Sequence, residues 1–172
     1  MKQNILIVDD EPDIRDVISV ILNDEGYKTN CVSNAQEAQA KINIEIPSLI
    51  ILDIWMRDST MDGLSLLNWI KDSNPEIPVL MISGHGTVEI AVNAIKAGAY
   101  DFIEKPFKSE KLLFMVSRAL ENSELKKENE ELKQQVRRTD MIVGKSSIIN
   151  SVRQTIAKVS QTNSRVLICL LY

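Results

Sequence analysis

The chain has 172 residues, a formal net charge of −4, 44% hydrophobic residues and 26% charged residues. Such a chain can bury one well-formed domain plus a smaller appendage, and its composition is ordinary for a soluble globular protein. The acidic balance argues against a general nucleic-acid-binding surface. No apolar run approaches the roughly 20 residues of a membrane span, and no signal peptide precedes the first predicted strand, so we expect a cytoplasmic protein outside the membrane.

Apolar runs of strand length alternate with segments of helical periodicity along residues 1–120. The predicted strands are residues 4–9, 28–32, 49–53, 78–82 and 100–104. The predicted helices are residues 12–25, 34–45, 64–73, 87–97 and a last one that begins near Ser109. This alternation predicts an α/β fold, a flavodoxin-like, doubly wound (βα)5 parallel sheet with helices on both faces and right-handed crossovers.

Periodicity also predicts which helical residues face the sheet. In the helix over 12–25, the apolar residues at helical spacing are Ile14, Val17, Ile18, Ile21 and Leu22. In the helix over 64–73, Leu67 is expected to face inward. Trp69 lies on the opposite side of that helix from Leu67, which fits either partly buried packing or an exposed patch.

The composition changes after about Leu120, and residues 121–139 form a segment of a different kind. Glu121 to Arg138 contains no aromatic residue, Gly or Pro, and Leu125 and Leu132 lie seven positions apart. This pattern is typical of a short coiled coil, and also of a solvated helical linker. On the first interpretation, residues 112–138 pair two copies of the chain into a homodimer.

The region after residue 139 is predicted to hold a short extended piece, a helix from Ser146 or Ser147 through Val159, and one apolar strand over 166–172. One helix and one strand cannot make a core of their own. We therefore expect residues 140–172 to be the opening fragment of a second α/β domain whose remainder is missing.

Gly144-Lys145-Ser146 resembles the end of a phosphate-binding loop, but the match is incomplete. The first glycine of G-x-x-x-x-G-K-S would fall at position 139, which is Thr139. We therefore expect neither ATP hydrolysis nor direct DNA binding from this chain, and a regulatory role rather than an enzymatic one.

Side chains suited to phosphoryl chemistry follow four of the five predicted strands. Asp9 and Asp10 follow the first strand, Asp53 ends the third, Ser83 follows the fourth and Lys105 follows the fifth. Open α/β sheets bind ligands at the carboxyl ends of their strands. Each feature alone is commonplace, since acid pairs cap helices and Lys-Pro makes turns. Their ordered occurrence on a βα alternation predicts a single site for a divalent cation and a phosphoryl group.

The residue types assign the roles within this site. Mg²⁺ prefers octahedral oxygen coordination with several waters. Its predicted protein ligands are Asp9, Asp10, Asp53 and the backbone carbonyl of Trp55. Asp53 lies at the centre of the sheet and is the predicted phosphoryl acceptor. Lys105 supplies a point charge to one phosphoryl oxygen, and the Ser83 hydroxyl can donate to another.

The motifs of residues 1–120 resemble those of the receiver domain of bacterial two-component response regulators. The matching pieces are Ile-Leu-Ile-Val-Asp-Asp-Glu (5–11), Leu-Ile-Ile-Leu-Asp (49–53), Met-Asp-Gly (61–63), Ile-Ser-Gly (82–84), Ala-Gly-Ala-Tyr-Asp-Phe (97–102) and Lys-Pro-Phe (105–107). The resemblance implies Mg²⁺-dependent phosphotransfer from a sensor histidine kinase to Asp53. It also implies a switch in which Ser83 follows the phosphoryl group and the aromatic residue Phe102 changes rotamer. Because residue 102 is Phe and not Tyr, this switch has no phenolic hydroxyl.

The loop over residues 54–60 is long and has no proline. This loop, the heptad segment and the C-terminal tail are similar to those of the NtrC group of regulators, and most closely to the NtrX type. The resemblance implies a receiver domain over 1–120, a helical or coiled-coil linker over 121–139 and a truncated AAA+ sigma-54 interaction domain over 140–172. An alternative function is therefore that of a sigma-54-dependent transcriptional regulator of the nitrogen-regulation type, whose ATPase and DNA-binding domains are missing here. A hydrolase that uses Asp53 as a transient nucleophile is a third hypothesis.

Overall fold

The computed structural model describes residues 3–57, 59–84, 87–139, 144 and 146–160. The chain divides into two compact units, Met1–Lys127 and Glu128–Tyr172, called here the first and second units. The predicted extended piece over 142–144 and the predicted strand over 166–172 lie wholly or largely outside the described residues.

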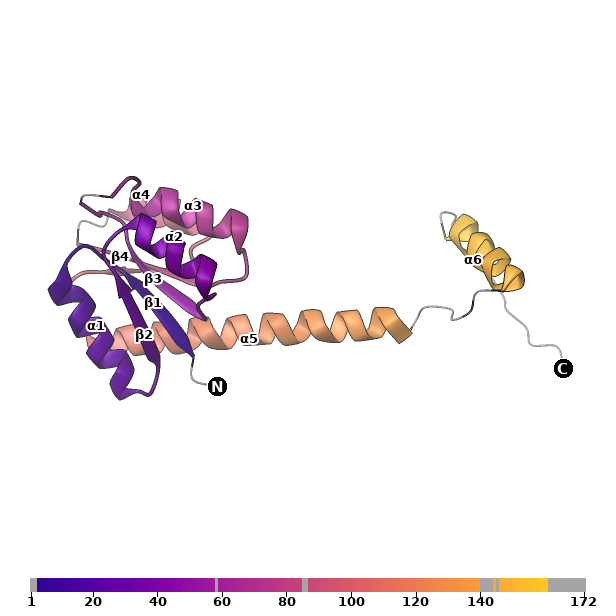
Figure 1. The fold of residues 1–172 in the computed structure, drawn as a ribbon, viewed down its shortest axis with the longest axis horizontal. Helices are drawn as coiled ribbons and strands as arrows, with labels where there is room; N and C mark the ends of the chain where they lie inside the picture. The colour runs from indigo at the N-terminus through magenta and orange to yellow at the C-terminus, as the bar shows by residue number, and fades with distance from the viewer. Residues whose placement is uncertain (1–2, 58, 85–86, 140–143, 145, 161–172) are drawn as a thin grey trace. The chain divides into compact units, whose positions relative to one another are not determined.

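Strands and helices alternate through the first unit as the sequence predicts (Figure 1). The strands are β1 (Asn4–Val8), β2 (Lys28–Val32), β3 (Leu49–Asp53), β4 (Val79–Ser83) and β5 (Asp101–Glu104). The helices are α1 (Pro12–Asp24), α2 (Ala35–Ile44), α3 (Gly63–Ser73), α4 (Val88–Lys96), α5 (Ser109–Thr139) and α6 (Ser147–Val159).

The five strands form one parallel sheet in the order β2-β1-β3-β4-β5. This is the flavodoxin-like order, which confirms the predicted fold class. The chain runs from β1 outward to β2 and then back to β3 on the other side of β1. Ligands in such sheets bind where the order reverses, outside the carboxyl ends of β1 and β3.

Two hydrophobic cores lie on opposite faces of the sheet, because successive strand residues point to opposite sides. Ile5 and Ile7 of β1 pack with residues of α1 and α5, whereas Leu6 and Val8 pack with residues of α2, α3 and α4. Figure 1 shows the same division, with α2, α3 and α4 on one side of the sheet. All five residues of β1, β3 and β4 are buried, as expected for central strands of a covered parallel sheet.

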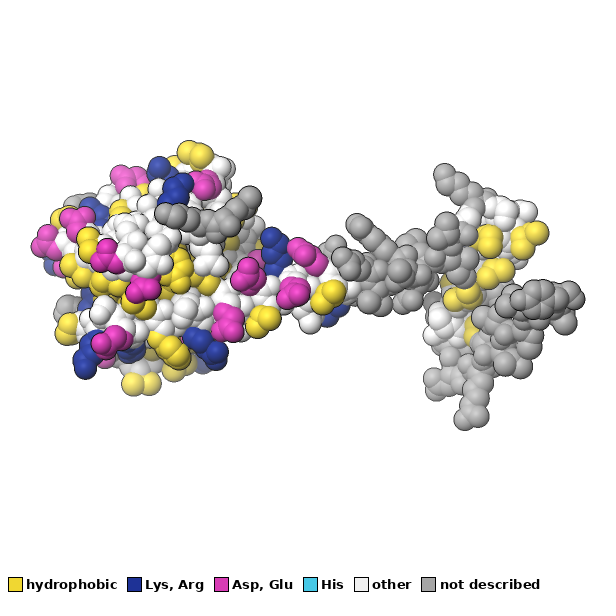
Figure 2. Space-filling view, turned by 90° about the horizontal axis from the view of Figure 1, so that it is seen from below, with side chains coloured by type: hydrophobic (Ala, Val, Ile, Leu, Met, Phe, Trp, Pro, Cys, Tyr) yellow, Lys and Arg dark blue, Asp and Glu magenta, His cyan; other side chains and the backbone are white. Residues whose placement is uncertain are grey.

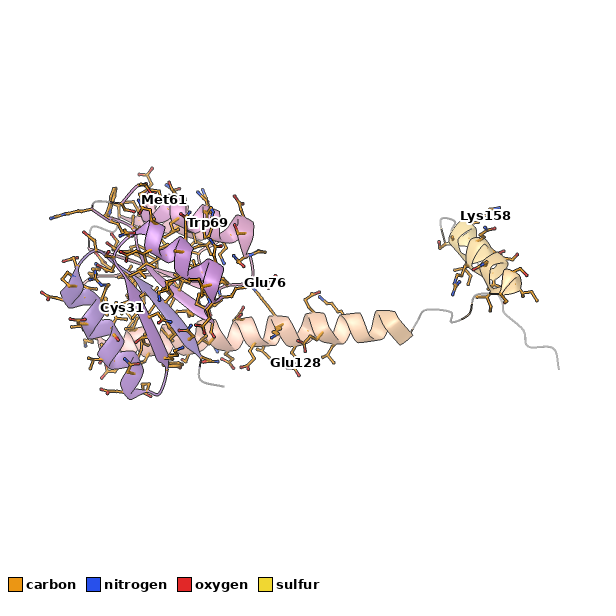
Figure 3. The ribbon with its side chains drawn as sticks, in the orientation of Figure 1. Cys31, Met61, Trp69, Glu76, Glu128 and Lys158 are labelled. Atoms are coloured by element: carbon orange, nitrogen blue, oxygen red, sulfur yellow. The ribbon has the colours of Figure 1, made fainter. Side chains whose placement is uncertain are left out.

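The helical faces agree with the periodicity except at one position. Ile18 and Leu22 of α1 are fully buried, but Val17 is 54% exposed, so its predicted inward position is wrong. The face of α1 that packs against the sheet therefore includes only part of the apolar residues of this helix. Trp69 of α3 (Figure 3) is partly buried and packs against the core beside α3, which resolves the two interpretations in favour of packing.

Helix α5 runs without interruption from Ser109 to Thr139. In the first unit its residues Leu112 and Val116 are fully buried against the sheet. Helix α6 of the second unit begins after Ser146, whose side chain accepts a hydrogen bond from the Ile149 amide, as expected for a helix cap.

The visible surface of the first unit carries acidic and basic side chains in a mixed arrangement (Figure 2). This matches the modest net charge of the sequence and gives that face no dominant sign. Among the described helices, none is both long enough and apolar enough to span a membrane.

Candidate functional site

The predicted site residues lie at the carboxyl ends of four neighbouring strands because of the sheet register. Val8 of β1 pairs with Leu52 of β3, so the residues that follow them, Asp9 and Asp53, come next to each other at the switch point. Asp53 in turn pairs with Ile82, the residue before Ser83.

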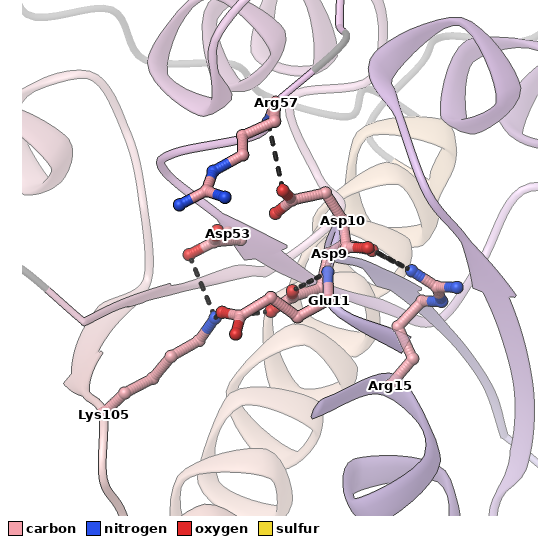
Figure 4. Close-up of polar contacts among 7 residues, drawn as sticks. All are labelled: Asp9, Asp10, Glu11, Arg15, Asp53, Arg57 and Lys105. Carbon is pink, nitrogen blue, oxygen red and sulfur yellow. Dashed lines mark hydrogen bonds and ion pairs between the residues drawn. The ribbon is translucent and has the colours of Figure 1, made fainter. Parts of the chain in front are cut away.

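Three carboxylates meet at this point. Asp9, Asp10 and Asp53 each offer an oxygen atom, and these atoms all lie within 4.8 Å of one another. Asp9 and Asp53 are buried, with side chains only 2% and 4% exposed. The structure thus brings together the three side chains that the sequence nominated as metal ligands (Figure 4).

Lys105 reaches this cluster from the end of β5. Its Nζ donates a hydrogen bond to Asp9 Oδ2 at 2.8 Å and another to Glu11 Oε1 at 3.2 Å. It also forms an ion pair with Asp53 Oδ1 at 3.5 Å. The lysine therefore bridges the acids that follow β1 and the acid that ends β3, and its role toward a phosphoryl group stays a prediction.

Asp53 Oδ1 is buried and accepts no hydrogen bond from any described group, although it lies within ion-pair distance of Lys105. Burial raises the pKa of Asp53 from 3.8 to about 7; the Lys105 charge opposes this shift, and the charges of Asp9 and Asp10 add to it. Because burial disfavours the ionised carboxylate, binding of a cation beside Asp53 would stabilise that ionised form.

The neighbouring ionisable groups respond to the same environment. Burial raises the pKa of Asp9 even though the hydrogen bond from Lys105 lowers it. For Lys105, burial lowers the pKa, but the hydrogen bond to Asp9 and the charge of Asp53 outweigh it and raise the pKa. Both shifts follow from one cause, since a single ammonium group faces several carboxylates in a desolvated place.

The acid pair is held in place by contacts that the sequence did not reveal. Arg15 Nη1 donates to the backbone carbonyls of Asp9 and Asp10 at 2.6 and 3.0 Å. The Glu11 amide donates to Asp9 Oδ1 at 2.9 Å, and the Arg57 amide donates to Asp10 Oδ2 at 3.2 Å. Arg15 lies on α1, six residues after Asp9 and five after Asp10, and no motif in the sequence marked this role.

Gly63, the first residue of α3, packs against the backbone at the end of β3. Its amide donates to the Ile54 carbonyl at 2.9 Å. A Cβ atom at this position would overlap the carbonyl oxygen of Asp53 and lie 2.8 Å from the Ile54 Cα. The glycine of Met-Asp-Gly is thus needed where α3 begins against the end of β3.

A hollow of about 520 Å³ lies over the cluster. It is lined by Asp10, Glu11, Asp53, Trp55, Met56, Arg57, Asp62, Gly84 and Lys105. Trp55 is 55% exposed and faces this hollow, so the position of its residue is compatible with the predicted ligand role of its carbonyl. That role stays a prediction.

The two predicted switch residues lie on β4 and β5 and do not line the hollow. Ser83 is completely buried at the end of β4, and its carbonyl accepts a hydrogen bond from the Lys105 amide at 2.8 Å. Phe102 of β5 is partly buried and packs against the core shared with α2, α3 and α4. Their switching roles stay predictions.

The donor set suits a magnesium ion. Each Mg–O distance is about 2.1 Å, so ligands on opposite sides of the ion lie about 4.2 Å apart. The oxygen atoms of Asp9, Asp10 and Asp53 fall within 4.8 Å of one another, and Asp53 Oδ1 lacks a hydrogen-bond donor. Hard oxygen ligands with room for water beside them match the preferences of this cation.

The comparisons with known proteins agree with this geometry. The family model of the response regulator receiver domain matches residues 5–117. This chain belongs to the response regulator receiver domain family. The crystal structure of the receiver domain of NtrX from Brucella abortus superposes with a TM-score of 0.67 and is 56% identical, covering 68% of this chain and 98% of that one.

Two further relatives place the receiver within the NtrC and NtrX group. The nitrogen assimilation regulatory protein NtrX of Azorhizobium caulinodans is 52% identical over 98% of this chain. The solution structure of the beryllofluoride-activated NtrC4 receiver domain dimer is 42% identical, with a TM-score of 0.66, covering 70% of this chain and 98% of that one. The chain spans 37% of the length of the Azorhizobium relative.

The chain therefore contains a regulatory receiver domain of the NtrX/NtrC type, which belongs to two-component phosphorelay signalling. This confirms the resemblance drawn from the strand-end motifs. The family match covers residues 5–117, and the roles of individual residues follow from the geometry of the site.

Proposed function

We propose that Asp53 accepts a phosphoryl group from a sensor histidine kinase and that this modification switches the receiver. The observation that carries the proposal is the buried Asp53 Oδ1, which accepts no hydrogen bond from a described group and faces Lys105 at 3.5 Å. Its carboxylate opens into a hollow large enough for a phosphoryl group.

The chemistry follows from the positions of the side chains. One carboxylate oxygen of Asp53 attacks phosphorus, and the bond from phosphorus to the donor imidazole nitrogen breaks, with its electron pair left on nitrogen. Lys105 neutralises one of the phosphoryl oxygens that result. The Ser83 hydroxyl donates to a second oxygen, and Phe102 changes rotamer as Ser83 moves.

Asp9, Asp10 and Asp53 are the proposed Mg²⁺ ligands, together with the Trp55 carbonyl. A bound Mg²⁺ would offset the charge of the carboxylates and of the incoming phosphoryl group. Arg15 and the Glu11 amide fix the acid pair, so these ligands are arranged before the cation arrives.

The direct test is intact-mass analysis after incubation with Mg²⁺ and acetyl phosphate. We expect the wild type to gain the mass of one phosphoryl group and Asp53→Asn to gain none. Asp72→Asn, which changes an exposed acid of α3, is the matched control and should label like the wild type. Equal labelling of Asp53→Asn would refute Asp53 as the acceptor.

We also propose the domain organisation inferred from the sequence, with a receiver over 1–120, a helical linker over 121–139 and the start of an AAA+ domain over 140–172. The family match over 5–117 and the division of the compact units after Lys127 support the first limit. The extent of the match to the Azorhizobium NtrX supports the last segment. Neither ATP hydrolysis nor DNA binding is proposed for these residues.

Pairing of two copies is proposed to use the exposed face of α5. Within the predicted pairing range of 112–138, Leu112 and Val116 are buried in the receiver core, whereas Leu125 and Leu132 are 59% and 53% exposed. The dimeric NtrC4 receiver is consistent with pairing in this group.

Replacing both Leu125 and Leu132 with lysine is expected to shift the chain from dimer to monomer, because charges at the seam of a coiled coil oppose its association. Light scattering coupled to size-exclusion chromatography measures the change. The matched control is Glu124→Lys plus Glu131→Lys, which places two lysines seven positions apart on α5 but off the row of Leu125 and Leu132, and it should stay dimeric. A double leucine-to-lysine variant that stays dimeric would contradict the α5 interface.

A further inference from the structure

Arg57 is a cationic residue at the edge of the hollow to which the receiver motifs assign no role. It lies in the loop between β3 and α3 and lines the hollow together with Asp53 and Lys105. In Figure 4 its side chain extends from the loop toward Asp53. Arg57 and Lys105 therefore lie at different sides of one opening, with the proposed acceptor between them.

The backbone of Arg57 is anchored to the site. Its amide donates to Asp10 Oδ2 at 3.2 Å across 47 residues of sequence, which ties the loop to the acid pair. Its guanidinium forms no ion pair with any carboxylate of the described residues. The guanidinium N–H groups of Arg57 therefore have no ion-pair partner among the described carboxylates, although Arg57 lines the hollow.

The charges around Asp53 leave room for a further cationic side chain. Lys105 pairs with Asp9 and Glu11, and Arg15 donates to the backbone carbonyls of Asp9 and Asp10. After transfer, the phosphoryl group adds about two negative charges. Lys105, Arg15 and one divalent cation together supply about four positive charges against about five negative ones, so the phosphorylated site stays short of positive charge.

We propose that Arg57 is a phosphoryl-binding residue that engages the group on Asp53 from the side opposite Lys105. This inference rests on the proposed function. The planar guanidinium offers paired N–H donors that match the spacing of phosphoryl oxygens, a contact that the point charge of a lysine does not reproduce. The hydrogen bond of its amide to Asp10 keeps the loop within reach while the side chain turns inward.

The test uses beryllofluoride, the phosphoryl analogue present in the NtrC4 receiver dimer. Wild type and variants of the full chain are titrated with beryllium and fluoride at saturating Mg²⁺, followed by tryptophan fluorescence because Trp55 lines the hollow. We expect Arg57→Gln to weaken beryllofluoride binding about tenfold, the scale of one charge-assisted hydrogen bond. Arg57→Lys should recover only part of the affinity.

Two controls separate this role from a general one. Arg118→Gln removes the same charge from an exposed position on α5 and should bind beryllofluoride like the wild type. Mg²⁺ titration without beryllofluoride should show Arg57→Gln binding the cation at least as tightly as the wild type, since a nearby positive charge opposes a cation.

The possible results are distinct. Unchanged beryllofluoride affinity in Arg57→Gln overturns the inference, and so does equal weakening in Arg118→Gln. A joint loss of Mg²⁺ and beryllofluoride binding in Arg57→Gln would also overturn it, by showing that Arg57 only holds the loop in shape. If the wild type itself neither binds beryllofluoride nor gains phosphoryl mass, the proposed function fails as well.

Discussion

Gly63→Ala is expected to destabilise the receiver by about 3 kcal/mol or more. The added methyl group would overlap the backbone carbonyl oxygen of Asp53 and approach the Ile54 Cα to 2.8 Å. These are backbone atoms at the end of a fully buried strand, so no flexible side chain can move aside. Relief requires a shift of β3 or of the start of α3.

A shift of β3 would displace the Asp53 carboxylate from Lys105 and Asp9. Because misplacement of a reacting group by about 1 Å can cost about a hundredfold in rate, labelling by acetyl phosphate should slow on that scale. Urea denaturation measures the loss of stability, and intact mass follows the rate of labelling.

Gly26→Ala is the matched control for this variant. Gly26 has φ +87, and a Cβ there meets no atom within 4 Å. The control should therefore cost only the strain of a left-handed alanine, about 1–2 kcal/mol, and should label at the wild-type rate. Gly63→Ala that is no less stable than Gly26→Ala would show that the ends of β3 and α3 can separate freely.

The second large effect concerns the charge of Asp53 itself. In the absence of divalent cations, Asp53→Asn should stabilise the fold by about 1–3 kcal/mol near neutral pH, even though it removes the proposed acceptor. Burial and the charges of Asp9 and Asp10 disfavour the ionised carboxylate, and the single ammonium of Lys105 does not offset them. An amide of the same shape avoids that repulsion.

The sign of the pH dependence follows from the raised pKa. The pKa of Asp53 is 3.8 ordinarily and about 7 in the folded chain. The folded state thus holds this proton more tightly, and the resulting stability is fully present below about pH 4 and is lost as the pH rises to about 7. One such group changes the free energy of unfolding by at most about 1.4 kcal/mol per pH unit. Asp9 has a raised pKa and acts in the same direction.

Urea denaturation across this pH range, with a chelator present, measures the effect. The wild type should lose stability between about pH 4 and pH 7, and Asp53→Asn should show a shallower slope. Asp72→Asn removes an equal charge from the surface and should keep the wild-type slope. An Asp53→Asn variant that is less stable than the wild type at neutral pH would contradict the charge balance described for the site.

The sequence was sufficient to predict the fold and the meeting of Asp9, Asp10, Asp53 and Lys105. Parallel strands buried on both faces read as apolar runs, and their carboxyl ends must share one edge of the sheet. Residues placed directly after such runs are therefore located by topology alone. The composition and heptad spacing after residue 120 also predicted that the last helix continues into the heptad segment, and α5 does continue to Thr139.

The remaining features depend on loop and helix geometry, which apolar patterning does not encode. Val17 has the spacing of an inward residue, but α1 contacts the sheet along a narrower stripe. Arg57 acquires its position from a backbone hydrogen bond to Asp10, a contact between segments 47 residues apart. The need for glycine at position 63 arises from a close approach of two backbones, which no local propensity signals.

Peptide groups, more than side chains, determine the positions of the strand ends. The amide of Asp9 bonds to Val32, that of Ile54 bonds to Ile82, and that of Lys105 bonds to Ser83. Substitution of a side chain leaves these amides and carbonyls in place. The lining of the hollow can thus diverge through residues such as Trp55 and Met56 while the acceptor and its lysine keep their spacing, so partner preference and phosphoryl chemistry can evolve separately on one scaffold.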